Sequence, residues 1–186
     1  NQNVIFNEDW AWGGYGGTIC NMEGTVDIKD NASLAVYSSY CALSNGNTSG
    51  SGEAVMNIIG NGGILFYDNI AYRTKDRFKG MAGAVHNHAN GTLNICGNGD
   101  VEFHNNTVLI FAEASSTGRD ASYLHALHNE GTLNLSAKGG KSIVFYDGIS
   151  SAKGSVVNLN KEYTDVDGKV QNAAGDIVFS GVRVES

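Results

Sequence analysis

The sequence predicts an all-β solenoid, a parallel β-helix, because one pattern of short strands recurs along the chain. The pattern GAVHNHANGTLNICGNGDVEFHNN, at 83–106, returns at 126–148 as ALHNEGTLNLSAKGGKSIVFYDG. Earlier it is split into two parts, at 17–28 and 54–69, and a thinner copy closes the chain. Short strands that repeat in one order with glycine between them are typical of solenoids, in which each unit stacks on the one before.

The composition favours paired strands joined by tight corners. The 186 residues include 25 glycines and no proline, and 41% are hydrophobic. Proline removes a hydrogen bond from a strand ladder, whereas glycine and asparagine adopt the left-handed conformation that tight turns need. We therefore expect one domain, residues 1–186, with loop excursions. Because the chain opens inside the repeat pattern, we expect it to be a fragment of a longer protein.

Each unit is predicted to hold three strands in which apolar and polar residues alternate. The first ends in asparagine, as in GAVHN at 83–87, and the second has the form GTLNI, at 91–95. The third is a short segment that ends in phenylalanine, such as VEF at 101–103. In the second strand, Leu93 and Ile95 should face the core.

Equivalent inward residues of successive copies should stack into ladders. The most regular ladder consists of Phe6, Phe66, Phe103, Phe145 and Phe179. Later members of this set are about 40 residues apart. Since one turn of a solenoid can take as few as roughly 20 residues, we expect two turns per unit; one turn with a long excursion is the alternative.

An asparagine follows each first strand and should lie at a corner of the fold. These residues are Asn21, Asn87 and Asn129. Their side-chain amides can bond to the backbone or to one another, as stacked asparagines do. A β-sandwich would also contain many short strands, but it would not require the same three strands to recur in order.

Three inserts interrupt the repeat, and inserts on one face of a solenoid are where binding sites usually lie. They cover residues 36–53, 71–80 and 107–123. The second insert is basic, on a chain of net charge −7. Its cations are Arg73, Lys75, Arg77 and Lys79. They are candidates for binding an anionic partner, although a solvated loop would look the same.

Three aromatic residues near the start form a second candidate binding site. Trp10, Trp12 and Tyr15 lie among glycines. Exposed aromatic side chains anchor many interfaces. The interpretation we favour is that they cover the open end of the core, which every solenoid has to close.

Four tetrapeptides resemble the repeats of a known family. They are GGTI at 16–19, FYDN at 66–69, AGAV at 82–85 and FHNN at 103–106. In their order and number they resemble the repeats of the chlamydial polymorphic outer membrane proteins and, more broadly, the passenger domains of bacterial autotransporters. AGAV carries alanine where the family has glycine. The resemblance implies a right-handed β-helix, export to the cell surface, and adhesion as the commonest role.

The histidines are clustered in the middle of the chain. They are His86, His88, His104, His125 and His128. His86 and His128 occupy the repeat position of Cys20, on the outward face beside a corner asparagine. A row of imidazoles can ligate a transition metal. Because duplication of one ancestral residue produces the same row, we predict no metal site and no cofactor.

No catalytic residue is predicted. Parallel β-helices include polysaccharide lyases and hydrolases, whose chemistry needs carboxylates roughly 5–10 Å apart or a calcium-binding acidic cluster. The candidate acids are Asp27, Asp68, Asp100 and Asp147. They form no tight group in the sequence, and no nucleophile-elbow, zinc-protease or phosphate-loop motif is present.

Charge, hydropathy and cysteine content exclude further classes. The net charge of −7 argues against nucleic-acid binding, which needs a basic face. No segment approaches the ~18 apolar residues of a transmembrane helix. Cys20, Cys41 and Cys96 lack metal-site spacing, so three buried thiols are expected, with one disulfide left open.

We therefore expect a non-enzymatic, adhesin-type passenger fragment, secreted or at the cell surface. Its partner would be a surface protein or a glycan of a host or of a neighbouring bacterium. The alternatives are a carbohydrate-active β-helix enzyme and a structural stalk. An enzyme needs a groove with convergent acids, an adhesin needs an exposed aromatic or basic patch, and a stalk needs neither.

Overall fold

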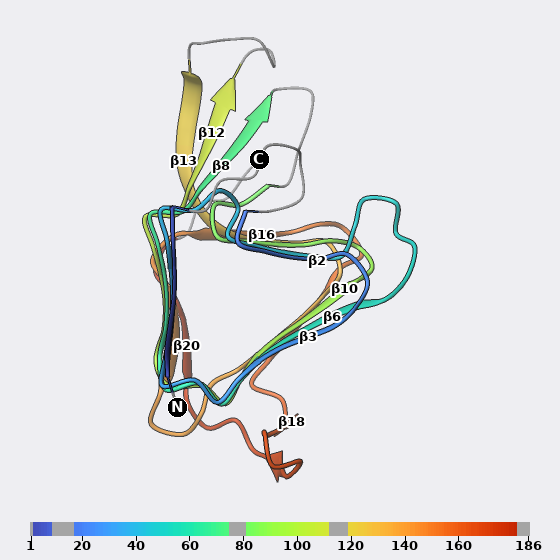
Figure 1. Ribbon diagram of the computed structural model, residues 1–186, viewed down its shortest axis with the longest axis vertical. Helices are drawn as coiled ribbons and strands as arrows, with labels where there is room; N and C mark the ends of the chain where they lie inside the picture. The colour runs from blue at the N-terminus through green and yellow to red at the C-terminus, as the bar shows by residue number, and fades with distance from the viewer. Residues whose placement is uncertain (1, 9–16, 75–80, 112–118, 182–186) are drawn as a thin grey trace.

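The computed structural model describes residues 2–8, 17–74, 81–111 and 119–181 (Figure 1). The described part of the chain is all-β, as the sequence predicts, and it contains no helix. It therefore offers no helix with the length and hydrophobicity that crossing a membrane requires.

Most strands belong to three sheets of parallel neighbours. The phenylalanine sheet has the order β1 (Asn3–Asn7), β4 (Ser33–Tyr37), β7 (Ile64–Tyr67), β11 (Val101–His104), β15 (Ser142–Phe145) and β20 (Asp176–Phe179). The threonine-asparagine sheet has the order β3 (Gly24–Lys29), β6 (Ala54–Ile59), β10 (Gly91–Cys96), β14 (Thr132–Ser136) and β17 (Val156–Leu159). The histidine sheet consists of β2 (Ile19–Asn21), β5 (Leu43–Asn45), β9 (Val85–Asn87), β13 (Arg119–Asn129) and β16 (Gly148–Ser151).

Neighbouring strands in each sheet are equivalent strands of successive copies. Phe66 of β7 pairs with Phe103 of β11, which pairs with Phe145 of β15. Between one phenylalanine strand and the next, the chain passes once through the histidine sheet and once through the threonine-asparagine sheet. Figure 1 shows the three sheets as the sides of a triangular outline. The expectation of two turns per unit is therefore wrong. Each copy passes once through the three sheets, and loop excursions account for the rest of its length.

The core lies between the three sheets and contains the predicted ladder. The side chains of Phe66, Phe103 and Phe145 are fully buried. Their rings stack with centroids 4.7 and 4.4 Å apart, and Phe179 follows at 5.4 Å. Phe6 is in line, but Val36 of β4 separates it from Phe66 in the register.

The structure contains a copy of the repeat that sequence analysis missed. The predicted insert 36–53 includes the last two residues of β4 and all of β5. β4 pairs with β1 and β7, and β5 pairs with β2 and β9. This copy has Val36 in place of phenylalanine, which hid it from an alignment built on that residue.

Asparagine ladders form the corners, as predicted. Asn21 donates from Nδ2 to Asn45 Oδ1, Asn45 to Asn87, and Asn87 to Asn129, with N···O distances of 2.8–2.9 Å. Asn45 belongs to the missed copy. These side chains are buried, and their amides also donate to backbone carbonyls. The ladder therefore satisfies polar groups that the corner removes from water.

Two of the predicted inserts contain strands that leave the triangular body. β8 (Ile70–Thr74) and β12 (Thr107–Phe111) pair in parallel, and β12 pairs antiparallel with the first part of β13. We call these strands the projecting sheet; Figure 1 shows them pointing away from the body. Ala71, Val108 and Tyr123 of this sheet form a second apolar cluster with Cys41 and Met81. Near the C-terminal end, β18 (Tyr163–Thr164) and β19 (Val170–Gln171) form a small antiparallel pair.

The three cysteines are free thiols. Cys41 and Cys96 are buried as expected, and burial raises the pKa of these thiols to about 12 and about 11. The expectation is wrong for Cys20, which is exposed. Cys20 lies in β2, the edge strand of the histidine sheet, and its side chain points outward.

Candidate functional site

Most residues predicted to bind a ligand lie outside the described residues. These are Trp10, Trp12, Tyr15, Lys75, Arg77 and Lys79. Of the basic segment, only the backbone of Arg73 is described, in β8 opposite Ile110 of β12. The aromatic and basic candidates therefore stay predictions, and the described residues indicate two other places.

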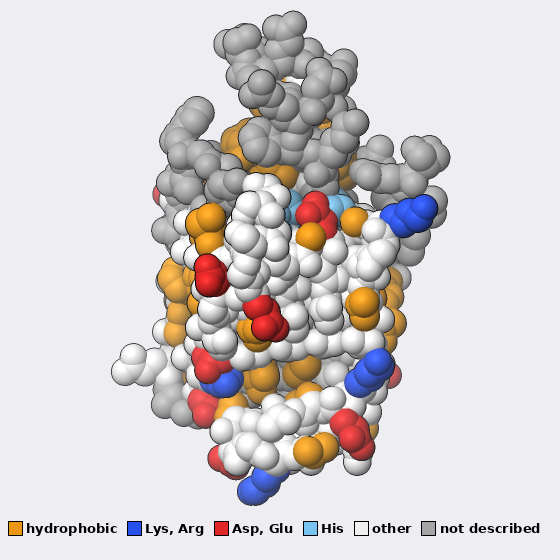
Figure 2. Space-filling model, turned by 90° about the vertical axis from the view of Figure 1, so that its right-hand side faces the viewer, with side chains coloured by type: hydrophobic (Ala, Val, Ile, Leu, Met, Phe, Trp, Pro, Cys, Tyr) orange, Lys and Arg blue, Asp and Glu red, His pale blue; other side chains and the backbone are white. Residues whose placement is uncertain are grey.

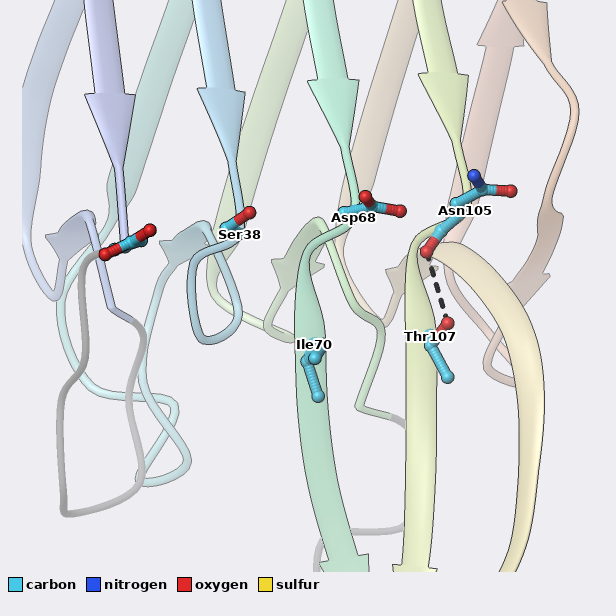
Figure 3. A pocket seen from close by; sticks show the side chains of 6 residues that line it. Ser38, Asp68, Ile70, Asn105 and Thr107 are labelled. Atoms are coloured by element: carbon cyan, nitrogen blue, oxygen red, sulfur yellow. Dashed lines mark hydrogen bonds between the residues drawn. The ribbon is translucent and has the colours of Figure 1, made fainter.

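The first place is an open groove of about 560 Å³ at the line where the projecting sheet leaves the phenylalanine sheet (Figure 3). Its lining residues are Glu8, Ser38, Asp68, Ile70, Asn105 and Thr107. Figure 3 shows Ser38, Asp68 and Asn105 in one line, each directly after a strand of the phenylalanine sheet. Ile70 and Thr107 begin β8 and β12, so the foot of the projecting sheet forms the other side.

One local conformation produces this line of polar side chains. Glu8, Ser38, Asp68 and Asn105 all have φ between 54° and 57°, in the left-handed region. Aspartate and asparagine tolerate this region better than most residues, which favours them at such turns. The backbone N–H of Asp68 donates to the carbonyl of His104 at 3.1 Å. The turns are thereby held to the next copy, while their side chains line the groove.

Aromatic side chains lie beside the groove on the phenylalanine sheet. Tyr37, Tyr67 and His104 are in register on its outward face. His104 stacks on Tyr146 with ring centroids 4.0 Å apart. Tyr67 is 40% exposed and Tyr146 is 46% exposed. We call these four residues the aromatic row.

The projecting sheet adds aromatic side chains on the other side of the groove. Tyr72 and Phe111 share the face of Ile70 and Thr107, because alternate residues of a strand point the same way. The ring of Tyr72 stacks on that of Tyr40 with centroids 5.3 Å apart, and its centroid lies 5.7 Å from that of Phe111. Polar turn residues are thus flanked by aromatic rings on both sides.

The second place is a cluster of histidines on the outward face of the histidine sheet. Cys20, Ser44, His86, His128 and Ser150 pair in this order across five strands. The sequence correctly assigned His86, His128 and Cys20 to one repeat position. Figure 2 shows histidine side chains next to an acidic one in the upper part of the face in view.

Glu130 connects these histidines. Its Oε1 lies 3.5 Å from His86 Nε2 and 3.5 Å from His128 Nε2. The ring of His88 lies against that of His86, with centroids 3.9 Å apart. Ser150 Oγ is 2.6 Å from His128 Nδ1 and 2.9 Å from His125 Nε2. The signal that sequence analysis missed is the residue after each corner asparagine, which is His88 in one copy and Glu130 in the next.

Burial and charge set the protonation of this cluster. His86 and His88 are buried, and burial lowers the pKa of both imidazoles, that of His88 to about 4. The imidazoles of His128 and His86, each with Nε2 3.5 Å from Oε1, hold the pKa of the Glu130 carboxyl well below its usual range. At neutral pH, His86 and His88 are therefore neutral imidazoles beside the Glu130 carboxylate.

No family model matches this chain, and it matches no curated protein and no solved structure. Its function therefore has to be inferred from the site itself.

The acids that the sequence singled out do not gather at one place. Asp27 accepts from Asn57 and pairs with Lys29 on the threonine-asparagine sheet. Asp100 pairs with Lys141 at 3.0 Å. These two carboxylates are held by neighbours on the exposed surface, and only Asp68 lines the groove.

Asp147 is placed differently from Asp68, although both follow a Phe-Tyr pair. Asp147 is buried and accepts from Asn106 Nδ2 at 2.7 Å, while Asn106 accepts from Asn69. Asp147 therefore ends a corner ladder in the position after Asn106, and burial raises the pKa of its carboxyl. Asp147 and Asp68 therefore occupy different positions, because this copy is one residue shorter at the corner.

Proposed function

We propose that this chain is a non-enzymatic, adhesin-type binding module of a secreted or surface-exposed repeat protein, folded as a right-handed parallel β-helix. Two features support the proposed architecture. Neighbouring strands are equivalent strands of successive copies. The chain also visits the three parallel sheets in the same order in each copy. The hand and the autotransporter-like role come from the sequence resemblance.

The groove flanked by aromatic rings is the observation that carries the proposed function. Exposed Tyr67 and Tyr146 present flat faces that stack on sugar rings or apolar groups. Ser38, Asp68 and Asn105 offer hydroxyl, carboxylate and amide groups at successive strands, about 4.8 Å apart. A row of this kind suits an extended ligand with a repeating structure, and we propose a glycan chain.

The charge of the groove favours a neutral glycan. Among the described residues, its lining includes the acidic side chains of Glu8 and Asp68 and no basic side chain. These carboxylates repel an anionic ligand that enters the groove. Salt screens this repulsion only at distances beyond about 8 Å. An anionic partner would instead point to the basic segment.

The binding prediction concerns Tyr67 and Tyr146. A glycan-array and host-protein screen of the purified chain should identify a neutral glycan. Changing both tyrosines to alanine should weaken its binding about tenfold or more, since each stacked aromatic contributes roughly 0.5–1.5 kcal/mol beyond its buried area. Isothermal titration calorimetry measures the affinity. Val170→Ala is the control, because Val170 is 68% exposed on β19 and outside the groove lining.

The same screen and variants can contradict the proposed site or the proposed ligand class. Unchanged affinity in the double tyrosine variant would show that the groove is not the binding site. If serine at positions 73, 75, 77 and 79 weakens binding instead, more strongly at low salt, the basic segment is the site. If neither variant has an effect, the site lies at Trp10–Tyr15 or in 107–123. Capture of a protein but no glycan would overturn the ligand class.

The enzymatic alternative can be tested at the same groove. Glu8 and Asp68 follow β1 and β7, which flank β4, so two strand spacings of about 4.8 Å separate their backbones. That span is at the long end of the range for an inverting glycosidase. We expect no turnover of pectin, alginate or neutral glycans. Cleavage measured by reducing-end release, and abolished by Asp68→Asn, would overturn the non-enzymatic proposal.

A further inference from the structure

The histidine cluster brings together three potential metal ligands from two neighbouring copies of the repeat. One ligand atom from each of His86, His88 and Glu130 lies within 4.8 Å of the other two. We propose that these three residues bind a divalent transition-metal ion, with Zn²⁺ as the best fit. The proposal is independent of the groove and differs from the sequence expectation of no metal site.

The donor set suits zinc. Zn²⁺ binds imidazole nitrogen and carboxylate oxygen at about 2.0–2.2 Å, usually with four ligands in a tetrahedron. Donors around one tetrahedral ion lie roughly 3.3–3.6 Å apart, so side-chain rotations that bring the three ligand atoms closer together would close the site. His128 Nε2 is 3.5 Å from the Glu130 carboxylate and is available as a fourth ligand.

The surroundings prepare these ligands. Among the described residues, the buried Nε2 of His86 has no hydrogen-bond partner, and Glu130 Oε1 is 3.5 Å away. His86 and His88 are both buried, so their ring nitrogens lie away from bulk water. The contact of Ser150 with His128 supplies the outer-shell support that ligating histidines normally have.

Duplication of the repeat does not account for the complete set. Copying explains why His86 lies next to His128. It does not explain the residue after each ladder asparagine, which is Met22, Gly46, His88 and Glu130 in successive copies. Only the third and fourth of these copies place a histidine and a carboxylate at adjacent positions, beside His86.

Because the ligands come from two copies, the ion would join adjacent turns of the body. His86 and His88 belong to the copy of β9, and Glu130 follows β13 in the next copy. A ligand that binds only the folded chain stabilises it by mass action. The Glu130 side chain is 30% exposed and gives the ion access.

The test uses the whole chain after removal of metal with a chelator. Isothermal titration calorimetry with Zn²⁺ alone should give one bound ion per chain. The melting temperature of the chain should rise with Zn²⁺ concentration. Glu130→Gln and His88→Gln should each weaken Zn²⁺ binding about tenfold or more, since loss of an outer-shell partner already costs about 10–100-fold. Co²⁺ should give the absorption spectrum of a four-coordinate site.

His104→Gln is the matched control. His104 and Glu102 form another histidine–carboxylate pair, 2.8 Å apart, on the phenylalanine sheet. Its loss should leave Zn²⁺ affinity unchanged. If His88→Gln does not fold, the partly exposed Glu130→Gln variant decides. The proposal is overturned if the native chain shows no stoichiometric Zn²⁺ binding, or if both ligand variants bind as tightly as the control.

Discussion

Replacing Phe103 with alanine should lower the free energy of unfolding by roughly 3–5 kcal/mol. Phe103 is fully buried, and its ring stacks between Phe66 at 4.7 Å and Phe145 at 4.4 Å. The neighbouring strands are held in register by their ladder hydrogen bonds, so they cannot collapse into the cavity. Urea unfolding followed by circular dichroism measures the loss.

The matched control is Phe179→Ala at the end of the same ladder. Phe179 is 38% exposed and has a ladder phenylalanine on one described side, Phe145 at 5.4 Å. Alanine there removes less buried area, so its cost should be clearly smaller. Equal costs at the two positions would contradict a continuous internal stack with its centre at Phe103.

Replacing Asn87 with alanine should have the second-largest effect, a loss of roughly 2–4 kcal/mol. Asn87 is fully buried; it accepts from Asn45 at 2.9 Å and donates to Asn129 Oδ1 at 2.8 Å and to the Thr132 carbonyl at 3.0 Å. Alanine leaves two buried acceptors without this donor, and a buried unsatisfied group costs about 1–3 kcal/mol. Asn87→Asp should cost more, because it places a carboxylate against Asn129 Oδ1.

The Asn94→Ala variant tests whether the cost at Asn87 comes from the burial of its hydrogen bonds or from loss of the bonds alone. Asn94 also belongs to an amide row, in which it donates to Asn57 and accepts from Asn134 at 2.6–2.7 Å. This row lies on the outward face of the threonine-asparagine sheet, where water can replace a lost partner. We expect a cost below about 1 kcal/mol. A loss at Asn94 as large as at Asn87 would show that burial is not the cause.

The strands and the core were predictable because they depend on local patterns. Alternation assigned Leu93 and Ile95 to the core, and both are fully buried. The phenylalanine that closes each third strand identified the ladder, and the asparagine after each first strand identified the corner. These features repeat in the sequence because each copy faces the same packing problem.

The missed copy and the position of Asp147 have a different cause. Val36 replaces phenylalanine in β4 without a change of face, since an aliphatic side chain also fills the core. At Asp147 the loss of one residue moves a carboxylate from the groove line to a buried ladder. A sequence pattern cannot distinguish these two outcomes, because only hydrogen bonding to the next strand decides which position a corner residue occupies.

The sequence by itself determined the all-β class, the three strands of each copy, the phenylalanine ladder and the corner asparagines. The tertiary structure alone decided the groove and the histidine–carboxylate cluster. Glu8, Ser38, Asp68 and Asn105 lie in line, and Glu130 lies beside His86, because parallel strands from separate copies pair in one register. Alternation is a property of one strand, whereas a site between copies depends on which strands are neighbours.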